Sequence, residues 1–258
     1  MKEYDYGNGI KELREITLRK SDKPIDRFKT IDKKTLVNTE TGEVKERKTP
    51  NNKAEVNSLC RGMLHEFRLL LYNINKVYPD GTVYYITMTN RSIISYEEFN
   101  YNLEKYIKKL KYANSQLTGD ELKYAFFKEA NEKGRYHIHG FIWFDSKEKL
   151  HLSEELIYEK WCFGTGKITK LETSQDLINT LWYVSNYTGK NNKKVIRKRK
   201  GLQFFPPNTH LVARTKNLEP VPFIEVDDNI FPTIENVISQ AKRDQKNIFY
   251  QSTFFIVD

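Results

Sequence analysis

The spacing of apolar residues predicts two amphipathic helices in the first half of the chain. From residue 52 to about residue 73, apolar side chains such as Met63 and Phe67 recur every three to four positions, which is typical of a helix with one buried face. A second helix is expected over residues 95–113, because Ser95 is a preferred N-cap residue and glutamates follow it in the first turn.

Runs of β-branched and aromatic residues predict strands between and after these helices. The run VYYITMT occupies residues 83–89, and two further runs, at 123–130 and 136–144, flank a turn at Asn131–Gly134, which indicates a hairpin. The other expected elements are short strands near 15–18 and 37, a turn at 39–44, a helix at 153–161, a strand at 166–172, a helix at 174–190, a short helix near 234–242 and an apolar end at 247–258. The short hairpin link favours a central antiparallel sheet of about five strands with helices packed on it, an α+β fold.

Composition narrows the functional class. The 258 residues suit one large domain or one domain with extensions, and 43 basic against 34 acidic residues give a net charge of +9, which favours nucleic acid or an anionic surface as partner. Two cysteines without a CxxC pair argue against a disulfide scaffold and a zinc ribbon. No apolar run approaches the roughly 18 residues of a membrane span, and the charged start lacks a signal-peptide stretch, so we expect a cytoplasmic protein without membrane contact.

Candidate chemistry is concentrated in the run YHIHGFIWF. His137 and His139 are separated by one residue, so on a strand both imidazoles project from one face, as two ligands of one metal would. Glu129 lies on the preceding strand, and cross-strand pairing could bring it beside them; a Glu-His-His set suits Mg²⁺ or Mn²⁺ holding a phosphate oxygen. Arg135, in the turn before the strand, is a candidate phosphate contact. The alternatives are two histidines on a wetted sheet face and an ordinary solvent carboxylate.

A second candidate group lies on the expected helix 174–190. Tyr183 and Tyr187 are four residues apart on one face, and Lys190 lies one turn beyond Tyr187. A phenol with a pKa near 10 is a poor nucleophile, but a lysine ammonium and a metal-bound phosphate would favour its phenolate form. The alternative is that the two tyrosines and Trp182 pack the helix on the sheet.

A basic run follows these tyrosines directly and is a candidate for gripping a DNA strand. Between residues 190 and 200, seven of eleven residues are basic and none is acidic. The basic residues are Lys190, Lys193, Lys194, Arg197, Lys198, Arg199 and Lys200. The alternative is a solvated loop.

Taken in order, these motifs resemble the HUH endonucleases, specifically the replication-initiator (Rep) branch that starts rolling-circle replication in plasmids and small single-stranded DNA phages. The strand Tyr85–Asn90 resembles the first family motif, Arg135–Gly140 the histidine–hydrophobe–histidine motif, and Tyr183–Lys190 the tyrosine motif. The resemblance covers about residues 55–218, which predicts a nicking domain there, a polar extension at 1–54, a second extension at 219–258 and no helicase domain.

The resemblance implies an HUH/RRM-like fold of ferredoxin-like plait type and a sequence-specific, metal-dependent single-stranded DNA nickase that also rejoins. In it, Glu129, His137 and His139 would hold Mg²⁺ or Mn²⁺. Tyr187 would attack the origin to leave a 5′-phosphotyrosine and a free 3′-OH, and Tyr183 would act in a later round. Host helicase and DNA polymerase would be the partners, in a bacterial cytoplasm.

Two departures and two alternatives remain open. Asn186 stands where two-tyrosine family members commonly have lysine, which leaves Lys190 alone in that motif, whereas Tyr183 favours the two-tyrosine group over single-tyrosine initiators that carry glutamate there. The run Gly164–Lys167 lacks the first glycine and the Ser/Thr of a P-loop. The alternative functions are a non-catalytic RRM-like binder of single-stranded DNA or RNA, and an HUH transposase.

Overall fold

The chain separates into two compact units in a computed structural model. It describes residues 2–18, 28–32, 35–46, 49–56, 59–119, 121–145, 151–185, 188–191, 194–197, 201–225, 236–245 and 248–256. One unit comprises residues 1–5, 9–51 and 222–258, and the other comprises residues 6–8 and 52–221. Each unit is described separately.

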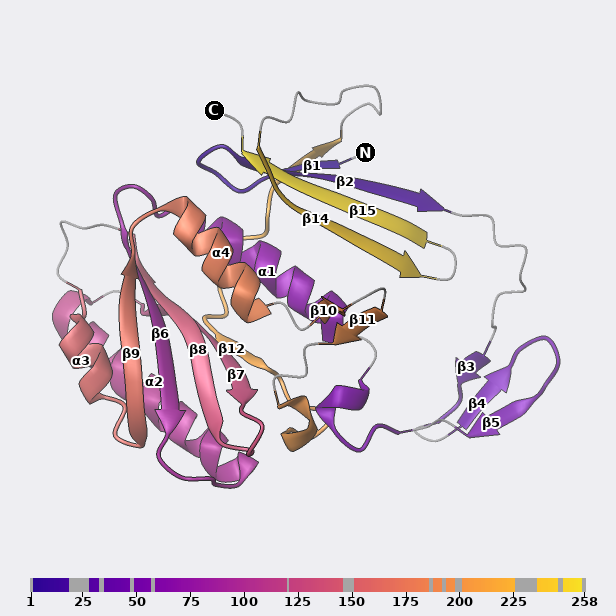
Figure 1. The fold of residues 1–258 in the computed structure, drawn as a ribbon, viewed down its shortest axis with the longest axis horizontal. Helices are drawn as coiled ribbons and strands as arrows, with labels where there is room; N and C mark the ends of the chain where they lie inside the picture. Colours follow the sequence, from indigo (N-terminus) through magenta and orange to yellow (C-terminus); the bar gives the residue numbers. More distant parts are fainter. Residues whose placement is uncertain are drawn as a thin grey trace. The chain divides into compact units, whose positions relative to one another are not determined.

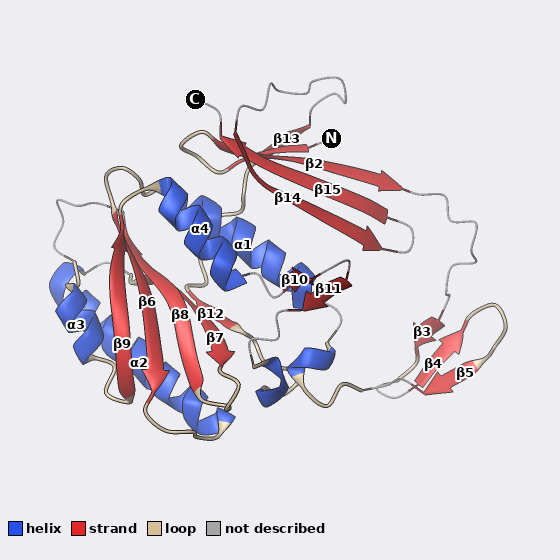
Figure 2. Cartoon of the chain, in the orientation of Figure 1, coloured by secondary structure: helices blue, strands red, loops and turns tan. Residues whose placement is uncertain are grey.

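The larger unit, 52–221, contains a five-stranded antiparallel sheet in the order β12-β7-β8-β6-β9 and four α-helices (Figures 1 and 2). The strands are β6 (Thr82–Asn90), β7 (Lys123–Ala130), β8 (Tyr136–Phe144), β9 (Gly164–Leu171) and β12 (Val212–Arg214). The helices are α1 (Leu59–Asn75), α2 (Tyr96–Thr118), α3 (Glu154–Glu159) and α4 (Ser174–Ser185), with 3-10 turns at Lys53–Glu55 and Leu202–Phe204. The order β6-α2-β7-β8-α3-β9 is that of a ferredoxin-like plait. The predicted α+β fold with an antiparallel sheet is confirmed.

Local capping signals place the helix ends as the sequence predicts. The Ser95 hydroxyl accepts a hydrogen bond from the Glu98 N–H (3.1 Å) at the start of α2, and Ser153 does the same for α3 with Leu156 (3.2 Å). Gly119, with φ of +73°, ends α2 in the left-handed conformation that glycine adopts without strain.

Alternation along the strands sorts the sheet into two faces. On one face, Tyr136 of β8 stacks on Phe99 of α2 (ring centroids 4.8 Å apart), and Phe126 of β7 contacts Tyr106 of α2 (5.9 Å). The odd-numbered residues of β6, β7 and β8 point to the opposite face. Helix α4 lies on that face, because its Tyr183 contacts His139 of β8.

Helix α4 is shorter than predicted, which corrects the expected helix at 174–190. It ends at Ser185, and Thr188–Asn191 forms the strand β10, paired with β11 (Lys194–Arg197) so that Lys190 lies opposite Val195. Thr188 and Gly189 are weak helix formers, and the β-branched residues of β11 favour a hairpin. Lys190 therefore does not continue the tyrosine-bearing helix.

The smaller unit draws its sheet from both ends of the chain. Its five strands have the order β13-β1-β2-β15-β14, and all the pairs are antiparallel. They are β1 (Lys2–Asp5), β2 (Ile10–Leu18), β13 (Phe223–Glu225), β14 (Asn236–Gln245) and β15 (Ile248–Ile256). A three-stranded sheet of β3 (Phe28–Thr30), β4 (Thr35–Asn38) and β5 (Val44–Glu46) completes the unit, with Gly42 in the predicted turn.

The short helix predicted near residues 234–242 is wrong. Residues 236–245 form β14, which pairs with β15 along its whole length apart from one irregularity near Val237–Ser239. The ladder with β15 overrides a weak local helical pattern, because strand formation depends on the partner that the fold supplies.

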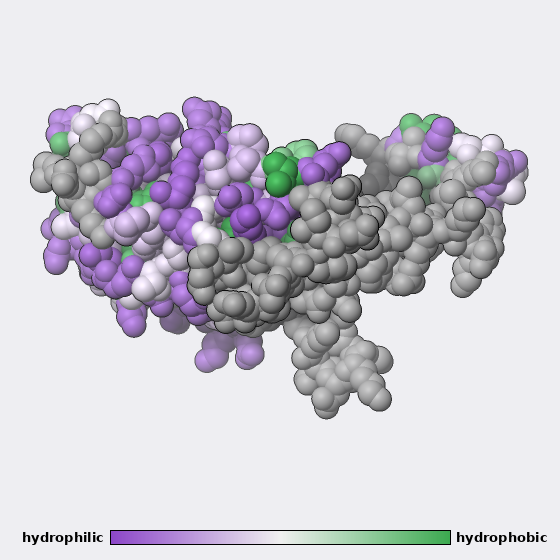
Figure 3. Space-filling view, turned by 90° about the horizontal axis from the view of Figure 1, so that it is seen from above, coloured by the Kyte–Doolittle hydropathy of each residue, from purple (hydrophilic) through white to green (hydrophobic). Residues whose placement is uncertain are grey.

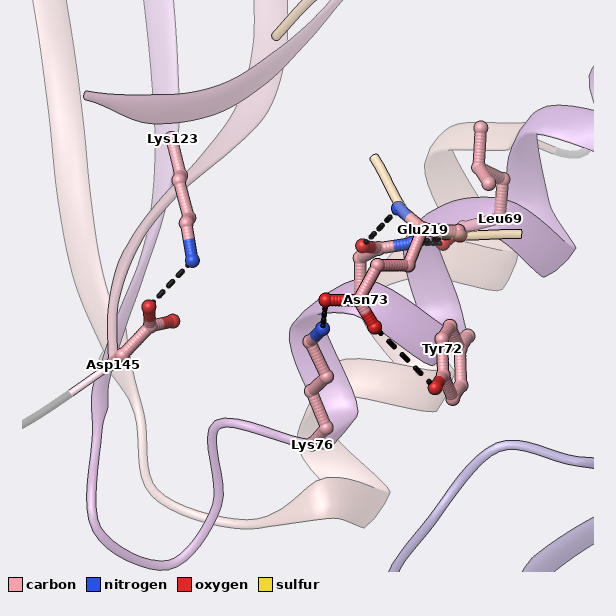
Figure 4. A network of polar contacts seen from close by, with 7 residues as sticks. All are labelled: Leu69, Tyr72, Asn73, Lys76, Lys123, Asp145 and Glu219. Atoms are coloured by element: carbon pink, nitrogen blue, oxygen red, sulfur yellow. Dashed lines mark hydrogen bonds and ion pairs between the residues drawn. The ribbon is translucent and has the colours of Figure 1, made fainter. Parts of the chain in front are cut away.

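A polar network ties the segment after β12 to the end of α1 (Figure 4). The Asn73 side chain accepts from the Glu219 N–H (2.9 Å) and donates to the Glu219 and Leu69 carbonyls (2.8 Å each). The Lys76 ammonium lies 2.6 Å from the Glu219 carboxylate and holds the pKa of that carboxyl below its ordinary value. These bonds fix the chain at the point where it leaves the larger unit.

Among the described residues, no helix is long and apolar enough to cross a membrane. On the face of the molecule in Figure 3, these residues are mostly hydrophilic, with small separate hydrophobic patches.

Candidate metal centre

The β7–β8 hairpin brings an acid and two histidines together. Glu129 lies directly opposite His137 in the ladder, and His139 is two residues further along the same face. The connecting turn sets this register: the Asn131 side chain accepts from the N–H groups of Lys133 (3.0 Å) and Arg135 (2.9 Å). The predicted hairpin is thus confirmed, and it converts a separation of eight residues into a cross-strand pair.

Gly134 is required in this turn for two reasons. Its φ of +80° lies in the left-handed region that other residues rarely adopt, and a Cβ there would lie 3.1 Å from the Phe204 ring. A larger residue would therefore strain the turn and disturb the register of the strand that follows.

Glu129, His137 and His139 form a compact set of metal-ligand side chains. The Glu129 Oε2 lies 3.7 Å from His137 Nε2 and 3.8 Å from His139 Nε2, and the two imidazole rings are perpendicular with centroids 5.0 Å apart. The Glu129 side chain is 6% exposed, and those of His137 and His139 are 16% and 13% exposed. Each residue offers a donor atom, and these three atoms lie within 4.8 Å of one another. The set is therefore sheltered but accessible from one side.

The donor chemistry fits a divalent ion. Two atoms that each lie about 2.1 Å from one ion are at most about 4.2 Å apart, so both carboxylate–imidazole distances are compatible with a shared ion. One carboxylate and two imidazoles leave coordination positions for water or phosphate, as expected for Mg²⁺ or Mn²⁺. A buried Glu-His-His group that could hold a metal ion is thus present, as the sequence predicts.

Two hydroxyl groups from the neighbouring strand β6 hold His139. The Tyr85 Oη lies 2.8 Å and the Thr87 Oγ1 2.9 Å from His139 Nδ1, and the Tyr85 and His139 rings are parallel to within 2°. Burial raises the pKa of Tyr85 to about 12, so its phenol stays protonated at neutral pH. The sequence motif contains both residues but assigns them no role; the available signal is that Tyr85 and Thr87 alternate in step with the two histidines.

Tyr183 approaches this group from α4. Its ring lies edge-on to that of His139, with centroids 6.1 Å apart, and the side chain is 51% exposed. The neighbouring Trp182 packs edge-on against Phe67 of α1 (5.2 Å), so it anchors α4 to a helix and not to the sheet. Helix α4 thus buries its apolar face and presents Tyr183 to the metal ligands.

The other predicted site residues are placed only in part. Arg135 is exposed, in the turn directly before β8. Lys190 belongs to β10, and Lys194 and Arg197 belong to β11. Tyr187, Lys193, Lys198, Arg199 and Lys200 lie outside the described residues.

Comparison with known proteins identifies the segment that carries this group. The model of a family described as Replication-associated protein ORF2 matches residues 83–192, a span that includes Glu129, His137, His139 and Tyr183. No curated protein and no solved structure matches the chain. The match confirms the resemblance to rolling-circle replication initiators that the sequence motifs predict. The part of the chain that holds the Glu-His-His group therefore matches a family of replication-associated proteins, which fits a rolling-circle replication initiator.

Proposed function

We propose that this replication protein nicks and rejoins single-stranded DNA at a replication origin through a covalent tyrosine–DNA link, using a divalent metal. The observation that carries the proposal is Tyr183 beside His139, next to Glu129 and His137, in a segment that matches a replication-associated family. A nucleophile next to a group able to hold a phosphate-binding cation is the arrangement that phosphoryl transfer requires.

In this mechanism Glu129, His137 and His139 bind the ion. When bound, Mg²⁺ or Mn²⁺ would polarise the scissile phosphate and spread the charge that develops on its oxygens. A tyrosine hydroxyl attacks the phosphorus, forming a tyrosine–phosphate ester at the 5′ end and releasing the 3′ oxygen, which takes up a proton as the phenol loses one. Attack by that 3′-OH on the ester reverses the reaction and rejoins a strand. The free 3′-OH would prime the host polymerase in the cytoplasm, with unwinding by a host helicase.

Either of the two tyrosines can serve as the nucleophile. The contact of Tyr183 with His139 supports Tyr183, whereas the argument for Tyr187 depended on Lys190 lying one turn further along the same helix. Because α4 ends at Ser185, that argument no longer holds. Lys190, on the adjoining hairpin, remains a candidate for neutralising the phosphate.

The sheet face beside the metal ligands offers a path for the strand. In the ladders, Lys167 of β9 lies opposite Thr87, which in turn lies opposite His139, so the three residues share one face. Lys167 and its neighbours on this face, Thr165 and Thr169, are exposed. An ammonium flanked by hydroxyl groups suits a phosphate backbone.

The test is an adduct assay. The protein is incubated with a labelled single-stranded oligonucleotide that carries the origin, with Mn²⁺, and the products are separated in SDS. We expect a protein-linked 5′ fragment, a free 3′ fragment and loss of both in excess EDTA. Binding that survives EDTA without an adduct would indicate the non-catalytic RRM-like binder. An adduct formed only on transposon-end sequences would indicate a transposase.

The basic run after α4 should contribute to DNA affinity by binding phosphates. Changing Lys193, Lys194, Arg197 and Lys198 to alanine is expected to weaken binding and to lower the slope of log K against log salt by about 0.7 for each phosphate that the variant no longer neutralises. Fluorescence anisotropy with single-stranded DNA at several salt concentrations measures both quantities.

The matched control removes four lysines from α2, which covers the opposite face of the sheet: Lys105, Lys108, Lys109 and Lys111. It makes the same change in net charge. Equal slopes for the two quadruple variants would mean that the basic run acts only through overall charge.

A further inference from the structure

The two histidines of the metal group are held differently by the protein. His139 Nδ1 lies within 2.9 Å of both the Tyr85 and the Thr87 hydroxyl groups, and its ring is stacked parallel to Tyr85. His137 Nδ1 has only a contact of 3.5 Å with the Arg135 carbonyl, at the limit of a hydrogen bond. The protein therefore fixes one ligand much more firmly than the other.

The strand register explains this difference. Thr87 is the direct cross-strand partner of His139, and Tyr85, two residues earlier, points to the same face. Thr89 occupies the equivalent position opposite His137. Its hydroxyl makes no hydrogen bond to His137 among the described residues, so three alternating β6 side chains divide into two that hold an imidazole and one that does not.

Contacts at Nδ1 decide what Nε2 can do. A neutral imidazole carries one N–H, and the nitrogen that binds a metal must offer its lone pair. His139 Nε2 is the atom that faces Glu129, at 3.8 Å, too far for an N–H hydrogen bond to the carboxylate. If Nδ1 donates its proton to a β6 hydroxyl, Nε2 is left with its lone pair directed toward Glu129. Both hydroxyl oxygens can accept that proton.

We propose that Tyr85 and Thr87 are positioning residues that hold His139 as the Nδ1–H tautomer, with Nε2 presented to a metal beside Glu129 and His137. The proposal deepens the proposed function and rests on it for the identity of the ion. Partners of this kind typically change metal affinity by about 10-fold to 100-fold. Removing the hydroxyls should therefore weaken metal binding without removing any ligand.

The first readout is the tautomer of His139 in metal-free protein, measured by long-range ¹H–¹⁵N correlation of the imidazoles and assigned by loss of the signal in His139→Gln. We expect the native protein to show Nδ1–H, and Tyr85→Phe/Thr87→Val to show a mixture of tautomers. In the second readout, calorimetric titration with Mn²⁺, the double variant should bind at least about 10-fold more weakly. Thr87→Ser in the Tyr85→Phe background keeps one hydroxyl and should restore most of the affinity.

The matched control is Thr89→Val, the same change on the same strand and face. We expect it to leave the His139 tautomer and the Mn²⁺ affinity unchanged. An Nε2–H tautomer in the native protein would overturn the proposal, and so would a folded double variant with native tautomer and native Mn²⁺ affinity. Failure of the proposed function is a separate result: the protein would then form no DNA adduct, whatever the tautomer.

Discussion

Alanine in place of His137 or His139 is expected to abolish nicking, with a loss of adduct of at least about 100-fold. Each change removes a nitrogen from a set of three donors that lie within 4.8 Å of one another, and two remaining ligands hold a divalent ion far more weakly. Glu129→Gln keeps the shape of the side chain but removes its charge, so we expect it to weaken Mn²⁺ binding more than DNA binding. Single-turnover nicking across an Mn²⁺ titration measures each effect.

The control for the histidine variants is His65→Ala. His65 is an exposed residue of α1 outside the metal group, so its loss should leave nicking unchanged. Melting temperatures separate loss of chemistry from loss of fold. Full activity of the native protein in excess EDTA, or an unaltered Mn²⁺ titration in Glu129→Gln, would contradict the metal role of this group.

Phenylalanine at position 183 is expected to remove most of the covalent adduct at the first nick. Tyr183 is the tyrosine whose ring contacts a metal ligand, and its side chain is half exposed, so a DNA phosphate can reach it. Loss of one exposed hydroxyl should change the free energy of unfolding by less than about 0.5 kcal/mol. Loss of adduct with an unchanged melting temperature would therefore report chemistry. Peptide mapping of the adduct by mass spectrometry identifies the linked tyrosine directly.

Comparison with Tyr187→Phe assigns the two tyrosines. We expect this variant to make the first nick but to fail in resolving concatemeric products. If Tyr187→Phe loses the adduct and Tyr183→Phe keeps it, the assignment made from the sequence motif is the right one. Equal adducts from both would mean that the nucleophiles are interchangeable. Tyr158→Phe, an exposed tyrosine of α3, is the control and should behave like the native protein.

Elements determined by neighbouring residues could be predicted from the sequence. The β7–β8 hairpin depends on a turn of a few residues, and the starts of α2 and α3 depend on serine caps. The meeting of Glu129 with the two histidines followed from that hairpin alone. Local reasoning was sufficient because no distant segment sets this register.

Features determined by distant segments could not be predicted. Segment 236–245 is a strand because it pairs with β15, and α4 ends early where a hairpin begins. The contact of Tyr85 with His139 spans 54 residues and depends on the pairing of β6 with β8 around α2. The alternating residues of Tyr85–Thr89 were visible in the sequence, but the strand beside which they lie was not.

The pairing of β2 with β15 has a consequence for synthesis of the protein. Ile10–Leu18 leaves the ribosome more than 200 residues before its partner Ile248–Ile256, which at about 5–20 residues per second is a delay of tens of seconds or less. Segment 52–221 contains every strand of its own sheet and can complete that sheet within the delay. The early strand β2 must wait with its backbone groups exposed on the β15 side, an edge open to chaperones and to pairing with other nascent chains. The order of translation thus lets the metal-binding unit mature first and leaves the sheet of the two chain ends until last.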